Sequence, residues 1–452
     1  MCRYDTIGVM DTRWTAALVL LAGANLVAQT ADEPVTVSSE HPRLFLRPAR
    51  LRLLQRERER TSARWQQLEL LVAGGAPMPE PGLADALYYA VSGEEAAGRR
   101  AVTWALGRAS DLRQQALVFD WCQGLMGDAQ KKELAARLAR GITPAAGDDS
   151  VAAVRSRVLA AVALYDHVPQ IPQRELERVV HDWWGRKIAP ALTSGRSVIP
   201  RDDAYALFEL LHAVRDSANL DLRESAPHFF KQFPIEHLMS YYPPPYPGPD
   251  SEYYIGIARN AGEPDLRKAA LSRAADLAMV AYDTNAPESQ ILQGFAMHDR
   301  FILRGTFGAP YEFLWANPYQ PGLSYTLAPL VYYNADFGRL FVRSNWDESA
   351  RWFGYFDGMM QVFEDGQVRI LTPQKPTQPI SLEQAVICPA QTARKFQIKA
   401  PEDAGVFLVG LEPRRAYEIE IDDEEMYEAT ADPGGILELE VPHEREVGVR
   451  LK

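Results

Sequence analysis

Two stretches of the chain carry most of the side chains that could do chemistry. The first, residues 199–205, contains a proline and leads into a predicted helix. Its candidates are Arg201, Asp202 and Asp203, together with His212 on the helix that follows. The second, residues 241–254, is rich in tyrosine and proline, and its candidates are Tyr246, Glu252, Tyr253 and Tyr254. Tyrosine, histidine and carboxylates can exchange protons with a ligand, and arginine can neutralise an anion. Aromatic rings on a rigid proline segment can hold a ligand in place.

Each of these candidates also has a purely structural interpretation. Asp202 and Asp203 lie at a predicted helix start, where carboxylates commonly cap backbone amides. His212 lies among leucines, which also suits a histidine in the core. Tyr253 and Tyr254 are predicted to begin a helix after the proline loop, where one of them would only pack.

Three further candidates lie later in the chain. His298 is predicted to end a helix, where a cation also favours the helix dipole. Arg343 and Trp346 lie in a predicted strand region, where they could equally fasten a sheet to the helices. We include all three as possible ligand-binding residues.

Composition excludes several classes of protein. The 452 residues include 48 Lys and Arg against 60 Asp and Glu, a formal net charge of −12, and no Lys/Arg-rich run occurs. Nucleic acid is therefore not an expected partner. The three cysteines do not form a disulfide framework, and none of the eight histidines is paired at i, i+4, so we expect neither a metal nor a cofactor.

The N-terminus predicts export. Arg13 precedes the apolar run 14–24 and then small residues, the pattern of a signal peptide that covers residues 1–28. Met10 fits the start of such a peptide better than Met1 does. The run is shorter than the roughly 20 apolar residues of a membrane span, and no later segment is long enough. We expect a periplasmic or secreted protein without a membrane span.

Residues 41–304 have the pattern of consecutive helices. Apolar residues recur at spacings of three and four, and Gly, Pro, Asp and Ser interrupt them every 12 to 25 residues. Asp111 is a predicted N-cap, and residues 266–282 are one of the predicted helices in this series. With no convincing strand among them, these helical hairpins must pack against one another, as an open solenoid or as a closed ring.

From Gly338 onward, the apolar residues recur at every second position, as in a β-strand. Residues 305–376 are predicted to connect the helices to the first strands, with a hairpin turn at Asp365-Gly366. Residues 377–452 then contain short, evenly spaced strands that indicate a small antiparallel β-sandwich. This C-terminal part is acidic, because residues 401–452 carry fifteen acidic and five basic side chains, leaving only −2 of the net charge elsewhere. The fold class is therefore α+β and multidomain, with helices first and a sandwich after.

Three segments resemble the heparinase II/III-like and alginate-lyase-like polysaccharide lyases. They are His41-Pro-Arg-Leu-Phe-Leu46, Ala116-Leu-Val-Phe-Asp-Trp121, and residues 340–353 with Arg343 and Trp346. The resemblance spans most of residues 41–360. It implies an (α/α) toroid followed by β-sheet, with a polysaccharide or oligosaccharide bound in a cleft where the two meet.

The resemblance also implies a reaction, β-elimination next to the carboxylate of a uronic acid. That chemistry requires a group that neutralises the carboxylate and a base near the sugar carbon, often a tyrosine that then protonates the leaving oxygen. By position, Tyr254 or Tyr253 would be base and acid, and Arg201 or His212 would neutralise the charge. Asp202, Asp203, Tyr246, Glu252, His298, Arg343 and Trp346 would contribute to substrate binding.

The chain departs from the family at two places. Asp202-Asp203 stands where the family usually has asparagine, and residues 355–363 lack the family's histidine-rich loop. Three functions therefore stay open: an exported polysaccharide lyase, a toroid glycoside hydrolase that uses Asp202 or Asp203 with Glu252, and a glycan-binding relative without activity. In the hydrolase, the two carboxylates would lie roughly 6.5–9.5 Å apart.

Overall fold

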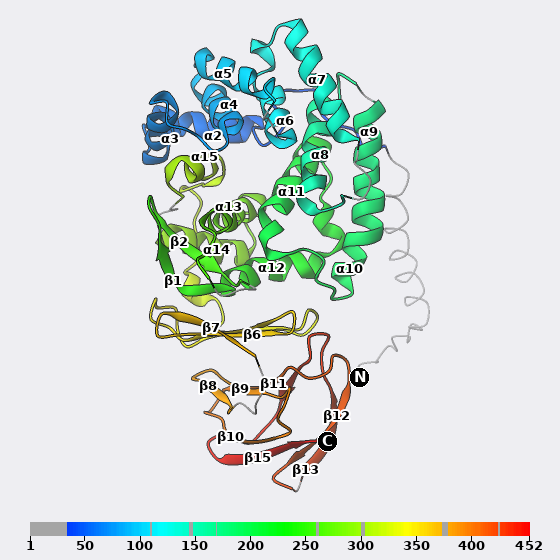
Figure 1. Cartoon of the computed structure of the whole chain (residues 1–452), viewed down its shortest axis with the longest axis vertical. Coiled ribbons are helices and arrows are strands. Elements are labelled where there is room, and N and C mark those ends of the chain that lie inside the picture. Colours follow the sequence, from blue (N-terminus) through cyan, green and yellow to red (C-terminus); the bar gives the residue numbers. More distant parts are fainter. Residues whose placement is uncertain are drawn as a thin grey trace, which may run out of the picture. The chain divides into compact units, whose positions relative to one another are not determined.

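The computed structural model describes residues 34–108, 111–143, 148–168, 170–258, 262–299, 303–372, 378–423 and 425–452. The predicted signal peptide, residues 1–28, lies outside the described residues. Residues from Val37 to Lys452 form one compact unit (Figure 1). No helix in the described part of the chain is both long and apolar enough to cross a membrane.

The first part of this unit is helical, as its sequence pattern predicts. The α-helices are α2 (Pro48–Glu59), α3 (Ala63–Ala73), α4 (Pro81–Ser92), α5 (Glu95–Ala105), α6 (Leu112–Trp121), α7 (Asp128–Ile142), α8 (Val151–Leu164), α9 (Gln170–Glu177), α10 (Ala189–Thr193), α11 (Ala204–Ala218), α12 (Pro227–Met239), α13 (Leu266–Tyr282), α14 (Pro287–His298) and α15 (Gly305–Trp315). Short 3-10 turns are η1 (Gln123–Leu125), η3 (Arg201–Asp203), η4 (Leu222–Ser225) and η5 (Tyr325–Leu327), and the π-helical η2 (Arg178–Ile188) joins α9 to α10. The helices continue through α15, beyond the predicted end at residue 304.

Local signals explain where several helices begin. The Asp111 side chain accepts a hydrogen bond from the Gln114 amide, so the predicted N-cap of α6 is confirmed. Asp265 caps α13 in the same way, and its bounds match the predicted residues 266–282. Alternate helices pack in sequence: α4 contacts α6, α6 contacts α8, α8 contacts α11, α11 contacts α13, α13 contacts α15, and α15 contacts α3 and α4.

The segment before α2 is anchored on α6. The Asp120 carboxylate accepts the backbone N–H of Arg43 at 2.9 Å and of Leu44 at 2.8 Å, and it accepts from His41 Nδ1 at 2.6 Å. The indole of Trp121 donates to the Leu44 carbonyl at 2.8 Å. Two of the three segments that carry the family resemblance therefore bind each other, and their role in this structure is to fix the start of the helical part.

One hairpin interrupts the helices, which corrects the expectation that no strand occurs there. Strands β1 (Tyr241–Pro247) and β2 (Glu252–Gly256) pair antiparallel, with a register shift between Tyr241 and Pro245. Tyr253 and Tyr254 thus lie on a strand and do not begin a helix. Proline has no N–H and restricts the residue before it to extended conformations, so this segment suits an irregular edge strand.

A five-stranded antiparallel sheet follows the helices. Its order is β3 (Val331–Asn334), β4 (Arg339–Arg343), β5 (Trp352–Phe356), β6 (Met359–Glu364) and β7 (Gln367–Leu371). The predicted turn at Asp365-Gly366 is confirmed, with positive φ at both residues. The sheet is attached to α12, because Trp352 donates from its indole to the Met239 carbonyl at 2.9 Å.

The C-terminal strands form two four-stranded sheets. One has the order β10 (Lys395–Lys399), β15 (Glu446–Leu451), β12 (Ala416–Ile421), β13 (Glu425–Thr430). The other has the order β14 (Ile436–Leu439), β11 (Gly405–Val409), β9 (Ala385–Pro389), β8 (Ile380–Leu382).

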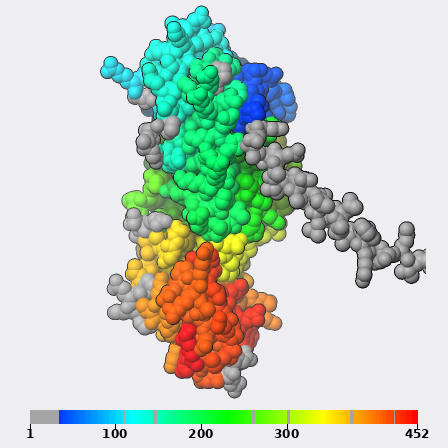
Figure 2. All heavy atoms as spheres, turned by 90° about the vertical axis from the view of Figure 1, so that its right-hand side faces the viewer, coloured from blue at the N-terminus to red at the C-terminus, as the bar shows by residue number. Residues whose placement is uncertain are grey.

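The two sheets share one apolar core. The segment 401–452, which carries most of the net negative charge, lies in the orange-to-red region of Figure 2. The sequence pattern did not predict β8 and β9, and β9 pairs parallel to β11, so the sandwich is not purely antiparallel. Cys122 and Cys388 are both buried and free, and burial raises the pKa of each thiol to about 12.

Candidate functional site

Four of the predicted site residues meet in one small pocket, which we call the aromatic pocket. It is lined by Tyr241, Tyr242, Pro243, Tyr254, Phe295, His298, Tyr325, Arg343, Trp346 and Glu348. These residues come from β1, β2, α14, η5, β4 and the segment after β4. The free volume is about 30 Å³, whereas an ordered water needs about 10–15 Å³. The pocket therefore has room for a small polar group but not for a whole sugar ring.

The hairpin places Tyr254 in the aromatic pocket and leaves Tyr253 out of it. Successive side chains on a strand point to opposite faces. The Tyr254 ring contacts Phe295 with ring centroids 4.7 Å apart, and Tyr241 at 6.0 Å. Tyr253 instead donates from its hydroxyl to Asp250 at 2.7 Å. Of the two tyrosines that the sequence could not separate, only Tyr254 lines the pocket.

Tyr325 reaches the pocket because its segment packs very closely on α14. A Cβ added to Gly294 would lie 1.7 Å from the Leu323 carbonyl oxygen, so only glycine permits this approach. The buried Gln293 side chain donates to the carbonyls of Asn317 and Gln320, at 2.9 and 3.0 Å. The sequence analysis did not identify Tyr325, because this contact depends on the tertiary fold.

Arg343 is a buried cation without a carboxylate partner in the described part of the chain. It is 4 % exposed, and its guanidinium lies over the Trp346 ring, 4.5 Å from the centroid. Its Nε atom is buried without a hydrogen-bond partner among the described residues. Burial lowers the pKa of Arg343 to about 10, while the nearby Tyr254 and Tyr325 oppose that shift. A buried unpaired charge is costly, so an anion bound here would gain a strong partner.

Tyr254 lines the same pocket as Arg343, and its own pKa is also shifted. Burial, with a smaller effect from Asp299, raises the pKa of Tyr254 to about 12. The phenol is therefore protonated at neutral pH and acts as a hydrogen-bond donor. The hydroxyl has no hydrogen bond to any described residue, so it is available to a ligand.

A buried polar network is hydrogen-bonded to Tyr241, which lines the aromatic pocket. Tyr241 donates to the Asp276 carboxylate at 3.0 Å and shares a hydrogen bond with the Ser272 hydroxyl at 2.9 Å. Arg273 donates to the same Asp276 carboxylate at 3.0 Å. Burial raises the pKa of Asp276 to about 6 and outweighs the opposite effect of Arg273. His237 lies in this network as well, and burial lowers its pKa well below the usual value.

Arg201 lies beside this network rather than in the aromatic pocket. Its guanidinium stacks on the Tyr241 ring, 4.6 Å from the centroid, and its Nε donates to the Ser240 hydroxyl at 2.7 Å. His212 is buried against Trp315, and its Nε2 donates to the Ala278 carbonyl at 2.9 Å. These contacts give His212 a core position, which is the structural alternative that its sequence context allowed.

The remaining predicted residues do not line the aromatic pocket. Asp202 forms an exposed ion pair with Lys268 at 2.8 Å. Burial, and then the neighbouring Asp202, raise the pKa of Asp203. Tyr246 donates to Glu263 at 3.0 Å at the surface, and Glu252 is an exposed residue opposite Pro247 in the hairpin. The structure thus brings together Tyr254, His298, Arg343 and Trp346, while these four residues lie elsewhere.

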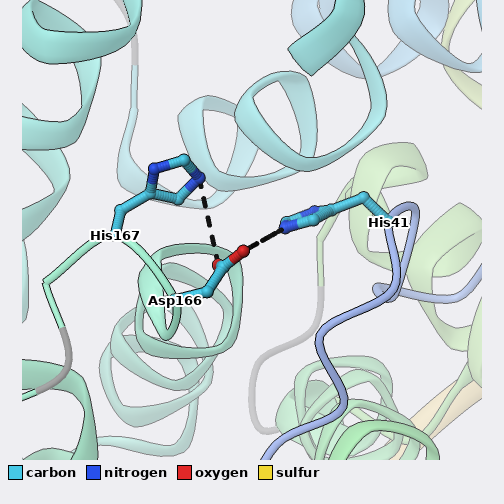
Figure 3. Close-up of side chains that lie close together, drawn as sticks. All are labelled: His41, Asp166 and His167. Atoms are coloured by element: carbon cyan, nitrogen blue, oxygen red, sulfur yellow. Dashed lines mark hydrogen bonds and ion pairs between the residues drawn. The ribbon is translucent and has the colours of Figure 1, made fainter.

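One other cluster has residue types that can hold a metal ion. His41, Asp166 and His167 place their ligand atoms within 4.8 Å of one another (Figure 3). However, Arg43 donates to His41 Nε2 at 2.5 Å and pairs with Asp166 at 3.0 Å. Because a guanidinium already lies against the imidazole nitrogen that would bind the ion, we interpret the cluster as an ion-pair network. It holds the start of the helical part.

Comparisons with known proteins do not show a family. No protein-family model matches the chain, and no curated protein matches it. Among solved structures, a chain described as "Glycoside hydrolase" aligns with 9% sequence identity over 89% of this chain and 75% of its own, with a TM-score of 0.31. This likeness is too distant to carry an argument about function.

Proposed function

We propose that the protein is carbohydrate-active, and that it binds the carboxylate of a uronic-acid-containing glycan in the aromatic pocket and cleaves the chain there by β-elimination. The observation that carries this proposal is Arg343. A buried guanidinium with no carboxylate partner in the described part of the chain, at the wall of a pocket, is suited to a bound anion. The sequence resemblance to polysaccharide lyases supports the same class of substrate.

The size of the pocket agrees with a carboxylate as the bound group. Its two oxygens are each about the size of a water, and the pocket has about 30 Å³ for them. The sugar ring would then lie outside, against the partly exposed Trp346 and near His298 and Tyr325. Aromatic faces suit the apolar side of a sugar ring. Arg343 therefore takes the neutralising role that the sequence analysis gave to Arg201 or His212.

Each pocket side chain has a separate role in the proposed elimination. Arg343 stabilises the negative charge that develops on the carboxylate when a base removes the proton from the adjacent carbon. The electron pair left on that carbon forms a double bond to its neighbour, and the bond to the leaving oxygen breaks. Tyr254, which is protonated at neutral pH, gives its proton to that oxygen. His298 is the base that we assign, because its exposed side chain lines the pocket and an imidazole can accept a proton.

We propose that the helical part is an (α/α) toroid. The sequential contacts of α4, α6, α8, α11, α13 and α15, with α15 returning to α3 and α4, support a closed ring. We also propose export through the predicted signal peptide. N-terminal sequencing of the protein purified from its native host tests this second proposal, and a mature chain that begins near Gln29 is the expected result.

The activity test is an assay on a panel of uronic-acid polysaccharides. β-Elimination leaves an unsaturated sugar at the new end, so ultraviolet absorbance should rise with at least one substrate. Reducing sugar released without that absorbance would contradict elimination and favour the hydrolase alternative, which uses Asp202 or Asp203 with Glu252. Saturable glycan binding without either product would favour a binding protein.

A further inference from the structure

A second, roomier cavity lies in the helical part, and we call it the helical pocket. Its volume is about 370 Å³, within the range of about 300–1,000 Å³ of small-ligand sites. It includes Glu288 and Ser289 from the beginning of α14, whereas the aromatic pocket uses Phe295 and His298 from the end of that helix. At 1.5 Å per residue, Ser289 and Phe295 are about 9 Å apart along the axis. The two pockets are therefore separate sites.

The wall of the helical pocket is largely apolar. Phe208 of α11, Phe230 of α12 and Met279 of α13 contribute to it, and all three are buried. Phe208 and Phe230 pack edge to face, with ring centroids 6.4 Å apart, so their positions are fixed by the core. This wall suits the apolar body of a small ligand.

The rim of the pocket carries an excess of negative charge. Arg223 is already neutralised, because it pairs with Asp221 at 3.0 Å and with Asp283 at 3.3 Å. Apart from this cluster, two carboxylates, Glu224 and Glu288, line the pocket against one cation, Lys231. Glu288 forms no ion pair with any described residue. An anionic ligand would meet this excess charge unfavourably, and a cationic ligand favourably.

A second observation, at Ser289, also favours a cationic ligand. The residue is 3 % exposed, lines the pocket, and has no side-chain hydrogen bond to any described residue. Glu288 and Ser289 both line the pocket, so the carboxylate and the hydroxyl offer two acceptors to a group with several donors. An ammonium group, with its positive charge and three N–H donors, satisfies both.

We propose that the helical pocket binds a small organic ammonium ion. Its ammonium donates to the Glu288 carboxylate and to the Ser289 hydroxyl, and its apolar body lies on Phe230. This site is independent of the glycan proposal, because it shares no residue with the aromatic pocket.

Three ring compounds of nearly equal size test the charge preference. Cyclohexylammonium, cyclohexanol and cyclohexanecarboxylate are titrated into the purified full chain, and binding is followed by ligand-observed NMR. We expect saturable binding of the ammonium at least about tenfold tighter than that of the alcohol, and weaker binding as salt increases. Equal affinity for the alcohol, tighter binding of the carboxylate, or no saturable binding of the ammonium would overturn the proposal.

Point variants then locate the bound ammonium. Glu288→Gln and Ser289→Ala should each weaken its binding about threefold or more. Glu428→Gln removes an exposed carboxylate on β13, and Arg343→Met changes the aromatic pocket, so both should leave ammonium binding unchanged. Circular dichroism confirms that each variant is folded. Unchanged affinity in folded Glu288→Gln and Ser289→Ala together would refute the site.

Discussion

The guanidinium of Arg343 lies 4.5 Å above the ring of Trp346, buried and without a carboxylate partner among the described residues. A cation–π contact of this kind recovers only part of the solvation that a buried charge loses. The arrangement therefore keeps a strong anion-binding group at the wall of the aromatic pocket, and it does so at the expense of stability.

Replacing Arg343 should show that its charge does not stabilise the folded protein. We expect Arg343→Met to leave the free energy of unfolding unchanged or to raise it by about 1–3 kcal/mol, because it removes a buried unpaired charge. The matched control on the same strand is Arg339→Met. Arg339 pairs with Glu236, so its loss should lower that free energy by about 3–5 kcal/mol. Urea unfolding measures both, and an equally large loss in Arg343→Met would show that Arg343 is structural.

The two adjacent tyrosines should differ in activity. Tyr254→Phe removes the proposed proton donor, so the turnover number should fall about 10²- to 10⁴-fold on whichever uronic-acid polysaccharide is cleaved. Its stability should change little, because the hydroxyl has no hydrogen bond to a described residue. Tyr253→Phe loses only the bond to Asp250 and should retain nearly full activity. Full activity in Tyr254→Phe would refute its assignment.

Asp120 should be important for folding rather than for the reaction. Asp120→Ala leaves two buried backbone N–H groups and the His41 imidazole without their acceptor, so we expect a loss of about 2–5 kcal/mol in unfolding free energy. Asp202→Ala breaks only an exposed ion pair and should cost less than about 1 kcal/mol. Chemical denaturation of the two variants provides the comparison, and equal stabilities would argue against the anchoring role of Asp120.

Glu312 should make stability depend on pH. Burial raises the pKa of its carboxyl from 4.5 to about 8 in the folded protein. Between these values the folded state holds a proton that the unfolded state releases, so the contribution of Glu312 to stability falls as the pH rises through this range. Glu312→Gln stays neutral and can still accept from the Leu303 amide. Relative to wild type, the variant should therefore gain stability at pH 8 compared with pH 5. Parallel stability curves for the two proteins would contradict the shifted pKa.

The fold could be predicted from sequence where local signals agree. The apolar spacing of residues 266–282 identified α13, and Asp365-Gly366 identified the turn between β6 and β7. The hairpin β1–β2 was missed, because its prolines interrupt the alternation that marks a strand. Strand β9 was missed because its residues are buried throughout, so its sequence shows no period of two.

The candidate site was only partly predictable, because it depends on distant segments meeting. The sequence identified Tyr254, His298, Arg343 and Trp346 by residue type and by resemblance. It could not show that Tyr325 joins them, since that position follows from the close packing of Gly294 against residues 322–325. Nor could it show that His212 faces the core, because both faces of α11 are largely buried.

The most direct test of the account measures how the protein recognises a carboxylate. Binding of a uronic-acid oligosaccharide is compared with binding of its methyl ester, in wild type and in Arg343→Met, by isothermal titration calorimetry. We predict that wild type binds the acid at least about tenfold tighter than the ester, and that Arg343→Met removes this preference. Equal affinity of wild type for acid and ester, or an unchanged preference in Arg343→Met, would contradict the proposed role of Arg343.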